Sequence, residues 1–316
     1  MSKVPDQESI MAAHERVAPF IHRTPVYTSE SLNKIAGANL FFKCENFQKV
    51  GAFKARGGMN AVLSLSAKDR KAGVATHSSG NHAQAVAMAA RENGVKAYIV
   101  MPSNSASVKK AAVLGYGAEL IECEPTLQAR EDTLQKVIEE TGAILIHPYD
   151  DYRIIEGQGT AAKELIEDIN ERLDYILTPV GGGGMLSGTS LSAHYFSKGT
   201  KVIGCEPSGA DDAYRSFTSM KLVPQTNPQT ICDGLRTSLG GKPFEIILKH
   251  VEDILLADDA EIVAAMQLIW ERMKIVVESS SAVPLAALLR NKERFAGKNV
   301  GIVISGGNVD LKALPF

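Results

Sequence analysis

The sequence predicts an α/β protein with mostly parallel sheets, and two features of the chain predict it. Short apolar runs of strand length alternate with stretches of helical spacing from Gly73 to His147. The same alternation resumes after Pro148 and ends in a last apolar run at Val300 to Ile304. Such alternation is typical of a twisted parallel sheet flanked by helices. With 316 residues, the chain is long enough for two units of this kind.

The first elements precede this alternation. Apolar residues recur at helical spacing from Ser9 to Ile21, which predicts an opening helix. Leu40 to Cys44 is predicted to be a short strand, because it is apolar and of strand length. A helix is expected to begin after Gly58, where apolar residues again follow helical spacing.

Residues 73–147 are expected to form a small domain of their own. Asn81 marks the start of one helix that Gly94 ends, and another helix ends around Gly115 and Gly117. The predicted strands of this domain are Val74 to Thr76, Ala97 to Met101, Glu119 to Cys123 and Ala143 to Ile146.

Residues 1–72 and 148–316 are expected to form the larger, cofactor-binding domain, which therefore includes both chain ends. Its later predicted strands are Tyr175 to Pro179, Lys201 to Cys205, Ile254 to Leu256 and Val300 to Ile304. Its later predicted helices begin near Thr160 and at Met185, or span Asp259 to Met273 and Ala282 to Phe295.

Composition and charge point to an ordinary globular protein. The chain is 45% hydrophobic and 22% charged, with a net charge of -2. This balance offers no electrostatic footprint for nucleic acid or for an acidic membrane, and no apolar run is long enough to cross a bilayer. The cysteines lie far apart with no zinc or redox spacing, so we expect reduced thiols in a cytoplasmic protein. They are Cys44, Cys123, Cys205 and Cys232.

A lysine between an aromatic residue and a basic, glycine-rich stretch is the first candidate for chemistry. Residues 51–58 read Gly-Ala-Phe-Lys-Ala-Arg-Gly-Gly, with Lys54 just before a helical pattern. A lysine that is desolvated there is suited to Schiff-base chemistry. Taken alone, these eight residues favour a solvated loop lysine, because short motifs match by chance.

Four consecutive glycines form the second candidate. The run Gly181, Gly182, Gly183 and Gly184 lies between a strand that ends at Val180 and the predicted helix. Backbone amides can converge there without side chains in the way, which makes an anion cradle suited to a phosphate. The alternative is a flexible turn, although glycines carry an entropic cost that a turn could avoid. The run lacks the Gly-Lys-Ser/Thr ending of a nucleotide P-loop.

Two more junctions carry polar residues. The loop Ser78-Ser79-Gly80-Asn81-His82 joins a strand to a helix, so its backbone donors can take a second anion. The alternative there is a capped helix, with Ser79 or Asn81 as the N-cap. Ser305 follows the last strand, where the alternative is a strand that simply runs into a Gly-Gly turn.

An acidic loop follows the strand at Lys201 to Cys205. Glu206, Asp211 and Asp212 supply carboxylates, and Ala210 adds a backbone carbonyl. Hard oxygen ligands of this kind suit Mg²⁺ or Ca²⁺. On its own, an acidic loop is more often solvated surface.

Together these motifs resemble the serine racemase and serine/threonine dehydratase family of pyridoxal-phosphate enzymes of fold type II, the fold of the tryptophan synthase β subunit. The motifs are Phe53-Lys54, Ser78 to His82, Gly181 to Gly188 and Ser305 to Asp310. They occur in the family's order over nearly the whole chain. The resemblance implies that Lys54 forms a Schiff base with pyridoxal phosphate, with Phe53 beside it. It implies further cofactor contacts at Gly181, Gly182, Gly183, Gly184 and Met185 for the phosphate, Asn81 for the ring oxygen and Ser305 for the pyridine nitrogen.

The resemblance also implies a substrate site and a reaction. Ser78, Ser79, Asn81 and His82 would hold the α-carboxylate, and Arg130 would reach the substrate. Ser79 would face the substrate opposite Lys54, as racemisation requires a proton removed on one face and returned on the other. The expected enzyme is a serine racemase that also eliminates the β-hydroxyl of a β-hydroxy amino acid, giving pyruvate and ammonia from serine. For Arg130 a solvated helix charge is an equal alternative.

One departure from the family keeps another substrate open. Tyr149 stands where vertebrate-type serine racemases have asparagine. The alternatives are therefore an L-threo-3-hydroxyaspartate ammonia-lyase or an aspartate-type racemase, in which Arg130 holds the second carboxylate. A remote alternative of a different class is a non-catalytic nucleotide-binding module.

The resemblance has implications for metal, assembly and regulation as well. Racemase-like members bind a divalent cation, Mg²⁺ or else Ca²⁺ or Mn²⁺, at positions matching Glu206, Ala210 and Asp212, and they are usually homodimers. Some also bind ATP between subunits. Glu30 and Val50 replace hydroxyl residues expected at that site, so the ATP site is not carried over.

Overall fold

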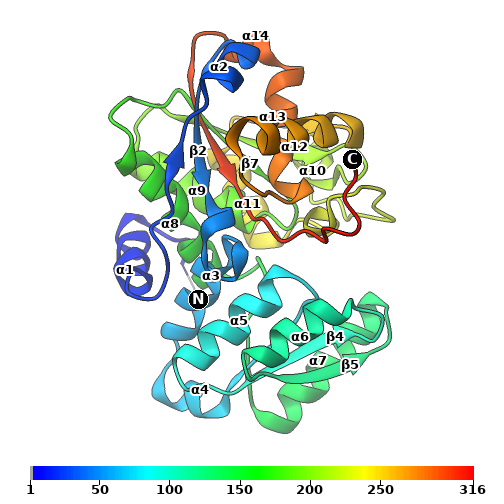
Figure 1. Ribbon diagram of the computed structural model, residues 1–316. Coiled ribbons are helices and arrows are strands. Elements are labelled where there is room, and N and C mark those ends of the chain that lie inside the picture. Colours follow the sequence, from blue (N-terminus) through cyan, green and yellow to red (C-terminus); the bar gives the residue numbers. More distant parts are fainter. Residues whose placement is uncertain (1–2) are drawn as a thin grey trace.

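The computed structural model describes residues 3–316, and its strands form two sheets, each covered by helices (Figure 1). The larger sheet has six strands in the order β1-β2-β10-β7-β8-β9. All neighbours in it are parallel except β1 and β2. Its strands are β1 (Val26–Tyr27), β2 (Asn39–Cys44), β7 (Tyr175–Pro179), β8 (Lys201–Pro207), β9 (Asp253–Ala257) and β10 (Asn299–Ile304).

The smaller sheet has four strands in the order β5-β4-β3-β6, all parallel. These strands are β3 (Val74–His77), β4 (Ala97–Pro102), β5 (Glu119–Cys123) and β6 (Ile144–Leu145). The two parallel sheets with flanking helices confirm the predicted fold class. All eight strands predicted along the two units are found, with bounds within two residues of the expected ones.

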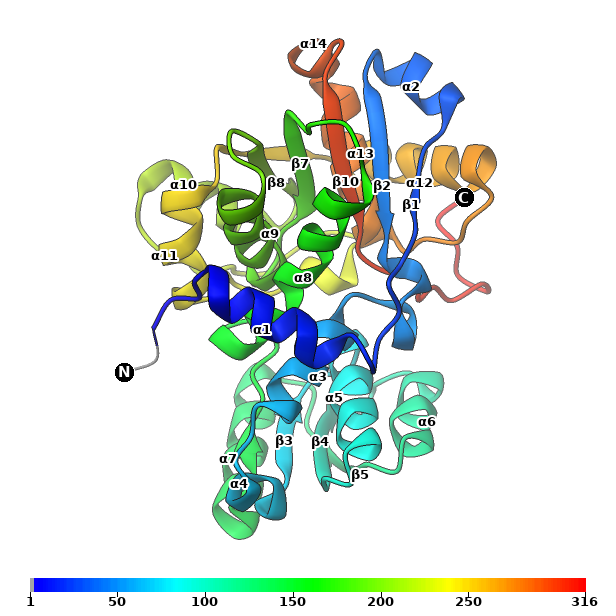
Figure 2. The same cartoon turned by 90° about the vertical axis from the view of Figure 1, so that its left-hand side faces the viewer.

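Helices surround both sheets, and Figure 2 shows the smaller sheet below the larger one, with α3 between them. Around the larger sheet lie α1 (Gln7–Val17), α2 (Glu30–Ala36), α8 (Tyr152–Asp168), α9 (Gly184–Phe196), α10 (Asp212–Ser219), α11 (Gly241–His250), α12 (Asp259–Met273), α13 (Ser279–Arg290) and α14 (Lys292–Phe295). The remaining helices are α3 (Lys54–Leu63), α4 (Ala67–Ala72), α5 (Asn81–Glu92), α6 (Ser107–Gly115) and α7 (Leu127–Thr141). Three short 3₁₀ turns are η1 (Glu45–Phe47), η2 (Lys49–Gly51) and η3 (Asp233–Leu235).

Two helix starts differ from the prediction. Helix α3 begins at Lys54, not after Gly58, and α8 begins at Tyr152, well before Thr160. Glycine has a low helix propensity, so the glycines in both segments concealed the true starts. Tertiary packing overrides that propensity here, because α3 packs against both α5 and α8. The division into domains at residues 72/73 and 147/148 remains our proposal.

Glycines let α3, α8 and α9 approach to backbone contact. A Cβ added to Gly157 would lie 2.6 Å from the Cα of Gly57, and one on Gly188 would lie 2.5 Å from the nitrogen of Gly159. No side chain larger than hydrogen fits at such distances without moving a helix. The helix that carries Lys54 and the helix that follows the glycine loop are therefore both fixed against α8.

A buried ionic cluster ties α3 to the larger sheet. The fully buried Arg56 guanidinium donates to both oxygens of Glu45 at 2.7 and 2.8 Å, and to both oxygens of Glu164 at 2.8 and 2.7 Å. Lys43 on β2, also fully buried, lies 2.8 Å from Glu164. Two carboxylates and two cations in this cluster compensate one another, which is the condition under which charges can be buried.

Two expectations concern the cysteines, expected to be reduced thiols, and the absence of an apolar segment long enough to cross a bilayer. All four cysteines are buried and unpaired, and burial raises the pKa of the Cys44 and Cys232 thiols to about 12. These thiols are therefore unreactive. In the part of the chain that the structure describes, no helix has the length and apolar character needed to cross a membrane.

Arg56→Ala is expected to destabilise the protein strongly, because it leaves Glu45 and Glu164 buried without their cation. The expected loss is about 3 kcal/mol or more in the free energy of unfolding, measured by denaturant titration. Arg23→Ala is the matched control, since Arg23 is 49% exposed in its pairs with Glu167 and Asp168. Its expected loss is below about 1 kcal/mol. Similar losses in the two variants would contradict the role given to the cluster.

Candidate active site

The candidate motifs meet where the carboxyl ends of the strands in both sheets converge. The amide of Phe53 donates to the carbonyl of Ser305 at 2.9 Å, and Ala52 forms a bridge with Gly306. The segment ahead of Lys54 is therefore an extra pairing partner for the chain just after β10. This contact joins two motifs that are about 250 residues apart in sequence.

Lys54 is the first residue of α3 and points its amine at the neighbouring segment. Its Nζ donates to the carbonyl of Pro148 at 2.9 Å and lies 5.0 Å from the centre of the Phe53 ring. Burial lowers the pKa of the Lys54 amine to about 8, although the Glu278 carboxylate acts in the opposite direction. A lysine of this kind is uncharged in a useful fraction near neutral pH, as a nucleophile or base requires.

The glycine loop connects β7 to α9 and is packed beneath an aromatic ring. A Cβ on Gly182 would lie 2.2 Å from the ring carbons of Tyr149, and one on Gly184 would lie 3.1 Å from the Cβ of the same tyrosine. Gly183, the N-cap of α9, has φ +88°, a conformation that favours glycine. No side chain caps α9, so the amides of its first turn are available to an anion.

The Ser78 to His82 loop reaches α5 without a side-chain cap. Neither Ser79 nor Asn81 is the N-cap, so that prediction is wrong; the N-cap is Gly80. The Asn81 side chain bonds elsewhere, and the Ser78 hydroxyl accepts from the Gly80 amide at 3.3 Å. The start of α5 is therefore a second place where free helix amides can receive an anion.

His82 lies at the base of this loop. The ring is buried, and its Nε2 is 3.0 Å from the carbonyl of Ile146. Burial, together with the charge of Lys54, lowers the pKa of His82 well below its usual value. The imidazole is thus neutral, and it fixes the loop to the smaller sheet.

Ser305 presents a hydroxyl at the end of β10. It is 2% exposed, and its Oγ lies 3.0 Å from the Oγ of Ser281 on α13. Ser281 in turn accepts from the amide of Gly306 at 2.7 Å. These contacts hold Ser305 in one orientation at the edge where the other motifs meet.

Arg130 lies on α7, close to the end of β3. Burial lowers the pKa of His77, and the charge of Arg130 contributes in the same direction. The only side-chain hydrogen bond of Arg130 among the described residues runs from its Nε to the Thr126 carbonyl at 3.4 Å. Among the described residues, no hydrogen bond or ion pair joins the Arg130 side chain to the other site residues.

The acidic loop brings two carboxylates together at the end of β8. Both oxygens of Glu206 accept backbone amides, from Ala213 at 3.0 Å and from Tyr214 at 2.8 Å. Asp212 accepts from the Leu239 amide at 2.7 Å, while its buried Oδ1 has no hydrogen-bond partner among residues 3–316. Burial raises the pKa of Asp212 to about 6 and that of Glu206 well above its usual range.

These carboxylates are suited to a hard cation. The buried Oδ1 of Asp212, which has no hydrogen-bond partner among residues 3–316, is an oxygen ligand that a cation could use. The carbonyl of Ala210 belongs to the same loop. Within residues 3–316, however, no three His, Cys, Asp or Glu side chains cluster as metal ligands. A cation here would need backbone carbonyl and water ligands as well.

Sequence reasoning missed four groups at this site. They are the Pro148 carbonyl, the imidazole of His147, and the side chains of Glu278 and Asn308. The His147 Nδ1 accepts from the amides of Tyr149 and Asp150 at 3.3 and 2.8 Å and so shapes the turn that holds the Lys54 amine. Burial lowers the pKa of His147 to about 4, so the ring stays neutral. Asn308 belongs to one of the quoted motifs, whereas nothing in the sequence singled out Glu278.

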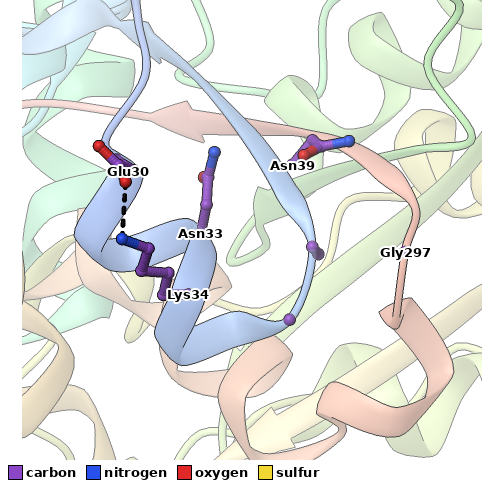
Figure 3. Close-up of a pocket in the computed structure, with 7 residues that line it drawn as sticks. Glu30, Asn33, Lys34, Asn39 and Gly297 are labelled. Atoms are coloured by element: carbon purple, nitrogen blue, oxygen red, sulfur yellow. Dashed lines mark hydrogen bonds and ion pairs between the residues drawn. The ribbon is translucent and has the colours of Figure 1, made fainter.

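A separate surface pocket of about 330 Å³ lies at the other end of the larger sheet (Figure 3). Asn39, the first residue of β2, and Gly297, just before β10, line it, so it lies at the amino ends of the strands. On one side of it, Glu30 and Lys34 pair along α2 at 2.6 Å. None of the candidate motifs contributes to this pocket.

Comparison with known proteins decides the family. A sequence model of the family described as "Pyridoxal-phosphate dependent enzyme" matches residues 17–306. The chain belongs to this family. It is 50% identical over 313 residues to a beta-hydroxyaspartate dehydratase from Paracoccus denitrificans (strain Pd 1222), covering 99% of both chains. It is 48% identical over 311 residues to a serine racemase from Dictyostelium discoideum, covering 97% of this chain and 96% of the other.

Structural similarity agrees with this assignment. The crystal structure of serine racemase from Dictyostelium discoideum matches with a TM-score of 0.93, covering 97% of this chain and 99% of that chain. The expected fold type II architecture is thereby confirmed, as is the resemblance to the racemase and dehydratase family. The non-catalytic nucleotide-binding module is set aside. This protein is a pyridoxal-phosphate enzyme.

The residues present fit the cofactor. Lys54 offers an amine of lowered pKa, and the α9 start offers a glycine cradle with free amides for a phosphate. Ser305 offers a hydroxyl at the same edge. Lys54 would hold the cofactor covalently, and Phe53, Asn81, Met185, Ser305 and the glycine loop would surround it; these individual contacts remain our proposals.

Gly182→Ala is expected to weaken cofactor binding at least about tenfold, because its Cβ would overlap the Tyr149 ring and force the loop or the ring to move. The measurement is the dissociation constant of pyridoxal phosphate from cofactor-free protein, by fluorescence titration. Gly241→Ala is the matched control, since a Cβ there meets nothing within 4 Å. Equal affinity in the two variants would show that the cradle tolerates a side chain.

Proposed function

We propose that this enzyme is a serine racemase that also eliminates water from serine and related β-hydroxy amino acids, giving pyruvate and ammonia from serine. The observation that carries the proposal is Ser79, which lies in the uncapped loop before α5. Its hydroxyl is half-buried and makes no hydrogen bond within residues 3–316. A free hydroxyl at the site, in a chain 48% identical to a serine racemase, supports a second acid-base group.

In this proposal the protein moves protons and holds the substrate. When bound, pyridoxal phosphate withdraws electrons from the α-carbon of the amino acid. Lys54 takes the α-proton, since its lowered pKa leaves part of the amine uncharged near neutral pH. Ser79 returns a proton on the opposite face to give the other enantiomer, and the amides at the start of α5 hold the α-carboxylate with Ser78, Asn81 and His82.

Ser305 favours elimination as the accompanying reaction. It offers a hydroxyl where a carboxylate would keep the pyridine nitrogen protonated and withdraw electrons more strongly. A weaker electron sink suits a reaction in which the β-hydroxyl leaves with the electrons. Racemisation and elimination thus share the first proton transfer to Lys54 and diverge after it.

Ser79→Ala is expected to lower racemisation of L-serine by about a hundredfold or more, the usual effect of losing an acid-base group, while elimination falls much less. Lys54→Ala is expected to abolish both. The measurement follows D-serine and pyruvate together from purified protein, with the exposed Ser31→Ala as control. Equal loss of both products in Ser79→Ala would contradict the two-face mechanism.

A second candidate is a hydroxyaspartate ammonia-lyase or an aspartate-type racemase. Two observations favour it: the charge of Arg130, which helps to lower the pKa of His77 at the end of β3, and 50% identity to a beta-hydroxyaspartate dehydratase. In this case Arg130 would hold the second carboxylate of the substrate. A kcat/KM for threo-3-hydroxyaspartate far above that for L-serine would replace the first proposal with this one.

The proposal includes a divalent cation, Mg²⁺ or else Ca²⁺ or Mn²⁺, held by Glu206, the Ala210 carbonyl and Asp212. The raised pKa values of the two carboxylates support it, because a cation would offset the cost of burying their negative charges. The proposal also includes a homodimer, on the family resemblance, and a cytoplasmic location, which the four unpaired thiols favour. We propose no ATP effector.

Addition of Mg²⁺ is expected to raise the Tm by about 2 °C or more at about pH 8, and by little at about pH 5. The pH dependence follows from Glu206 and Asp212, whose pKa values are raised in the folded protein. As pH rises and these acids lose their protons, the folded protein becomes less stable. A bound cation then takes the place of the lost protons and restores stability. Asp212→Asn should remove the shift. Asp211→Asn should keep it, because Asp211 pairs with Arg215 instead. A shift that survives Asp212→Asn would place the cation elsewhere.

A further inference from the structure

Glu278 is a buried carboxylate at the site that the proposed mechanism does not use. It is 8% exposed and is the N-cap residue of α13, yet its side chain does not cap that helix. Among the described residues, none of the ion pairs includes it. Burying a carboxylate without a cation lowers the stability of the fold unless hydrogen bonds compensate the lost hydration. The hydrogen bonds of Glu278 therefore indicate what the residue does.

The carboxylate bonds to an asparagine across the site. The Asn81 Nδ2 lies 3.2 Å from each oxygen of Glu278, and the backbone amide of Asn308 lies 3.3 Å from Oε2. Asn81 begins α5 on the smaller sheet, whereas Glu278 begins α13 on the larger one. The contact therefore joins the two halves of the molecule beside the cofactor site.

Asn308 extends this contact to the segment ahead of Lys54. Its Nδ2 donates to the Asn81 Oδ1 at 2.9 Å and to the Val50 carbonyl at 2.7 Å. Val50 has φ +56°, which is strained for a β-branched residue, and Gly51 receives a bond from the Gly307 amide at 2.9 Å. The segment Gly307 to Asn308 thus hydrogen-bonds both to the strained turn and to Asn81.

These bonds determine which way the Asn81 carboxamide faces. A carboxylate only accepts hydrogen bonds, so it requires the Nδ2 of Asn81, while the Nδ2 of Asn308 requires its Oδ1. A neutral amide in place of Glu278 could accept or donate, so it would no longer select the Asn81 nitrogen, and only the bond from Asn308 would still select the oxygen. The carboxylate and Asn308 together fix both ends of the Asn81 carboxamide.

We infer that Glu278 is a positioning residue that orients Asn81 toward the ring oxygen of pyridoxal phosphate and, through Asn308, steadies the turn ahead of Lys54. The inference rests on the proposed contact between Asn81 and the cofactor. Glu278, Asn308 and the strained turn at Val50 would then belong to the cofactor site, as one group connected by hydrogen bonds.

The charges that face Glu278 make this unit sensitive to pH. Asp233 of η3 disfavours its ionised form, whereas Lys109 of α6, which pairs with Asp233 at 3.0 Å, favours it; Asn81 and the Asn308 amide favour it as well. Lys54 of α3 and Glu278 also attract each other. Burial dominates and raises the pKa of Glu278 to about 7. The orienting carboxylate is therefore lost as pH falls through about 7.

Stability and positioning respond to pH in opposite directions. An acid whose pKa is higher in the folded than in the unfolded protein contributes less stability as pH rises, and this cost is complete above about pH 7. Glu278→Gln removes the buried charge, so it should leave the Tm of the cofactor-free protein at about pH 8 unchanged or higher. The same change should impair the cofactor site.

The test compares wild type and Glu278→Gln as cofactor-free full-length protein titrated with pyridoxal phosphate. The measurements are the dissociation constant and the visible absorption of the bound cofactor, from about pH 6 to about pH 9. We expect Glu278→Gln to bind about tenfold more weakly at about pH 8, the effect of one charge-assisted bond lost. The wild-type spectral transition near pH 7 should disappear in Glu278→Gln.

Two further variants complete the test. Asn308→Ala should weaken binding in the same direction, because it frees the Asn81 oxygen and the Val50 carbonyl. Glu156→Gln is the matched control and should bind like wild type, since Glu156 is another acid with a raised pKa but bonds to Asn60 among α1, α3 and α8.

Two results would overturn the inference. One is wild-type affinity and an unchanged pH transition in Glu278→Gln. The other is weaker binding accompanied by a lower Tm of the cofactor-free protein, which is the result expected of a merely structural residue. Failure of the proposed function is separate, because absence of D-serine and pyruvate would leave the affinity and spectral comparison intact.

Discussion

The position of the reactive lysine depends on the arginine two residues after it. Arg56 is buried between Glu45, at the end of β2, and Glu164, on α8, and bonds to all four carboxylate oxygens. A charge so placed is tolerated only in this geometry, since any displacement of α3 would leave buried charges unpaired. The cluster therefore specifies one position for the helix start at Lys54, even if apolar residues of similar volume could match it in stability.

The glycines between helices extend the same constraint to the glycine loop proposed to hold the phosphate. Gly57 against Gly157, and Gly159 against Gly188, bring α3, α8 and α9 to backbone contact. The loop before α9 is thereby held at a fixed place relative to Lys54, with the Tyr149 ring as its outer wall. The lysine and the cradle are far apart in sequence, and their proximity follows from helix packing more than from either loop.

The sequence could predict those features that depend on short stretches of neighbouring residues. Strands are short apolar runs, so the fold class was predicted correctly. The run from Gly181 to Gly184 is conspicuous in the sequence, and its role as a phosphate loop remains a prediction. Glu278 and the Pro148 carbonyl depend on contacts 197 and 94 residues away, which no local pattern contains. The starts of α3 and α8 were missed because glycines there serve helix packing and mask helix propensity.

The helix starts fall into two groups, those capped by a side chain and those, such as α5 and α9 at the site, without such a cap. Asp6, Ser29, Thr126 and Asp258 cap α1, α2, α7 and α12 with their side chains, each contributing about 1 kcal/mol. Helices α5 and α9 begin at glycines that offer no such cap. No side chain occupies their first-turn amides, so an anion bound there would complete the helix start. Ligand binding and local stability would then be coupled. An anion that accepts hydrogen bonds from these amides binds only the folded helix start and so stabilises it.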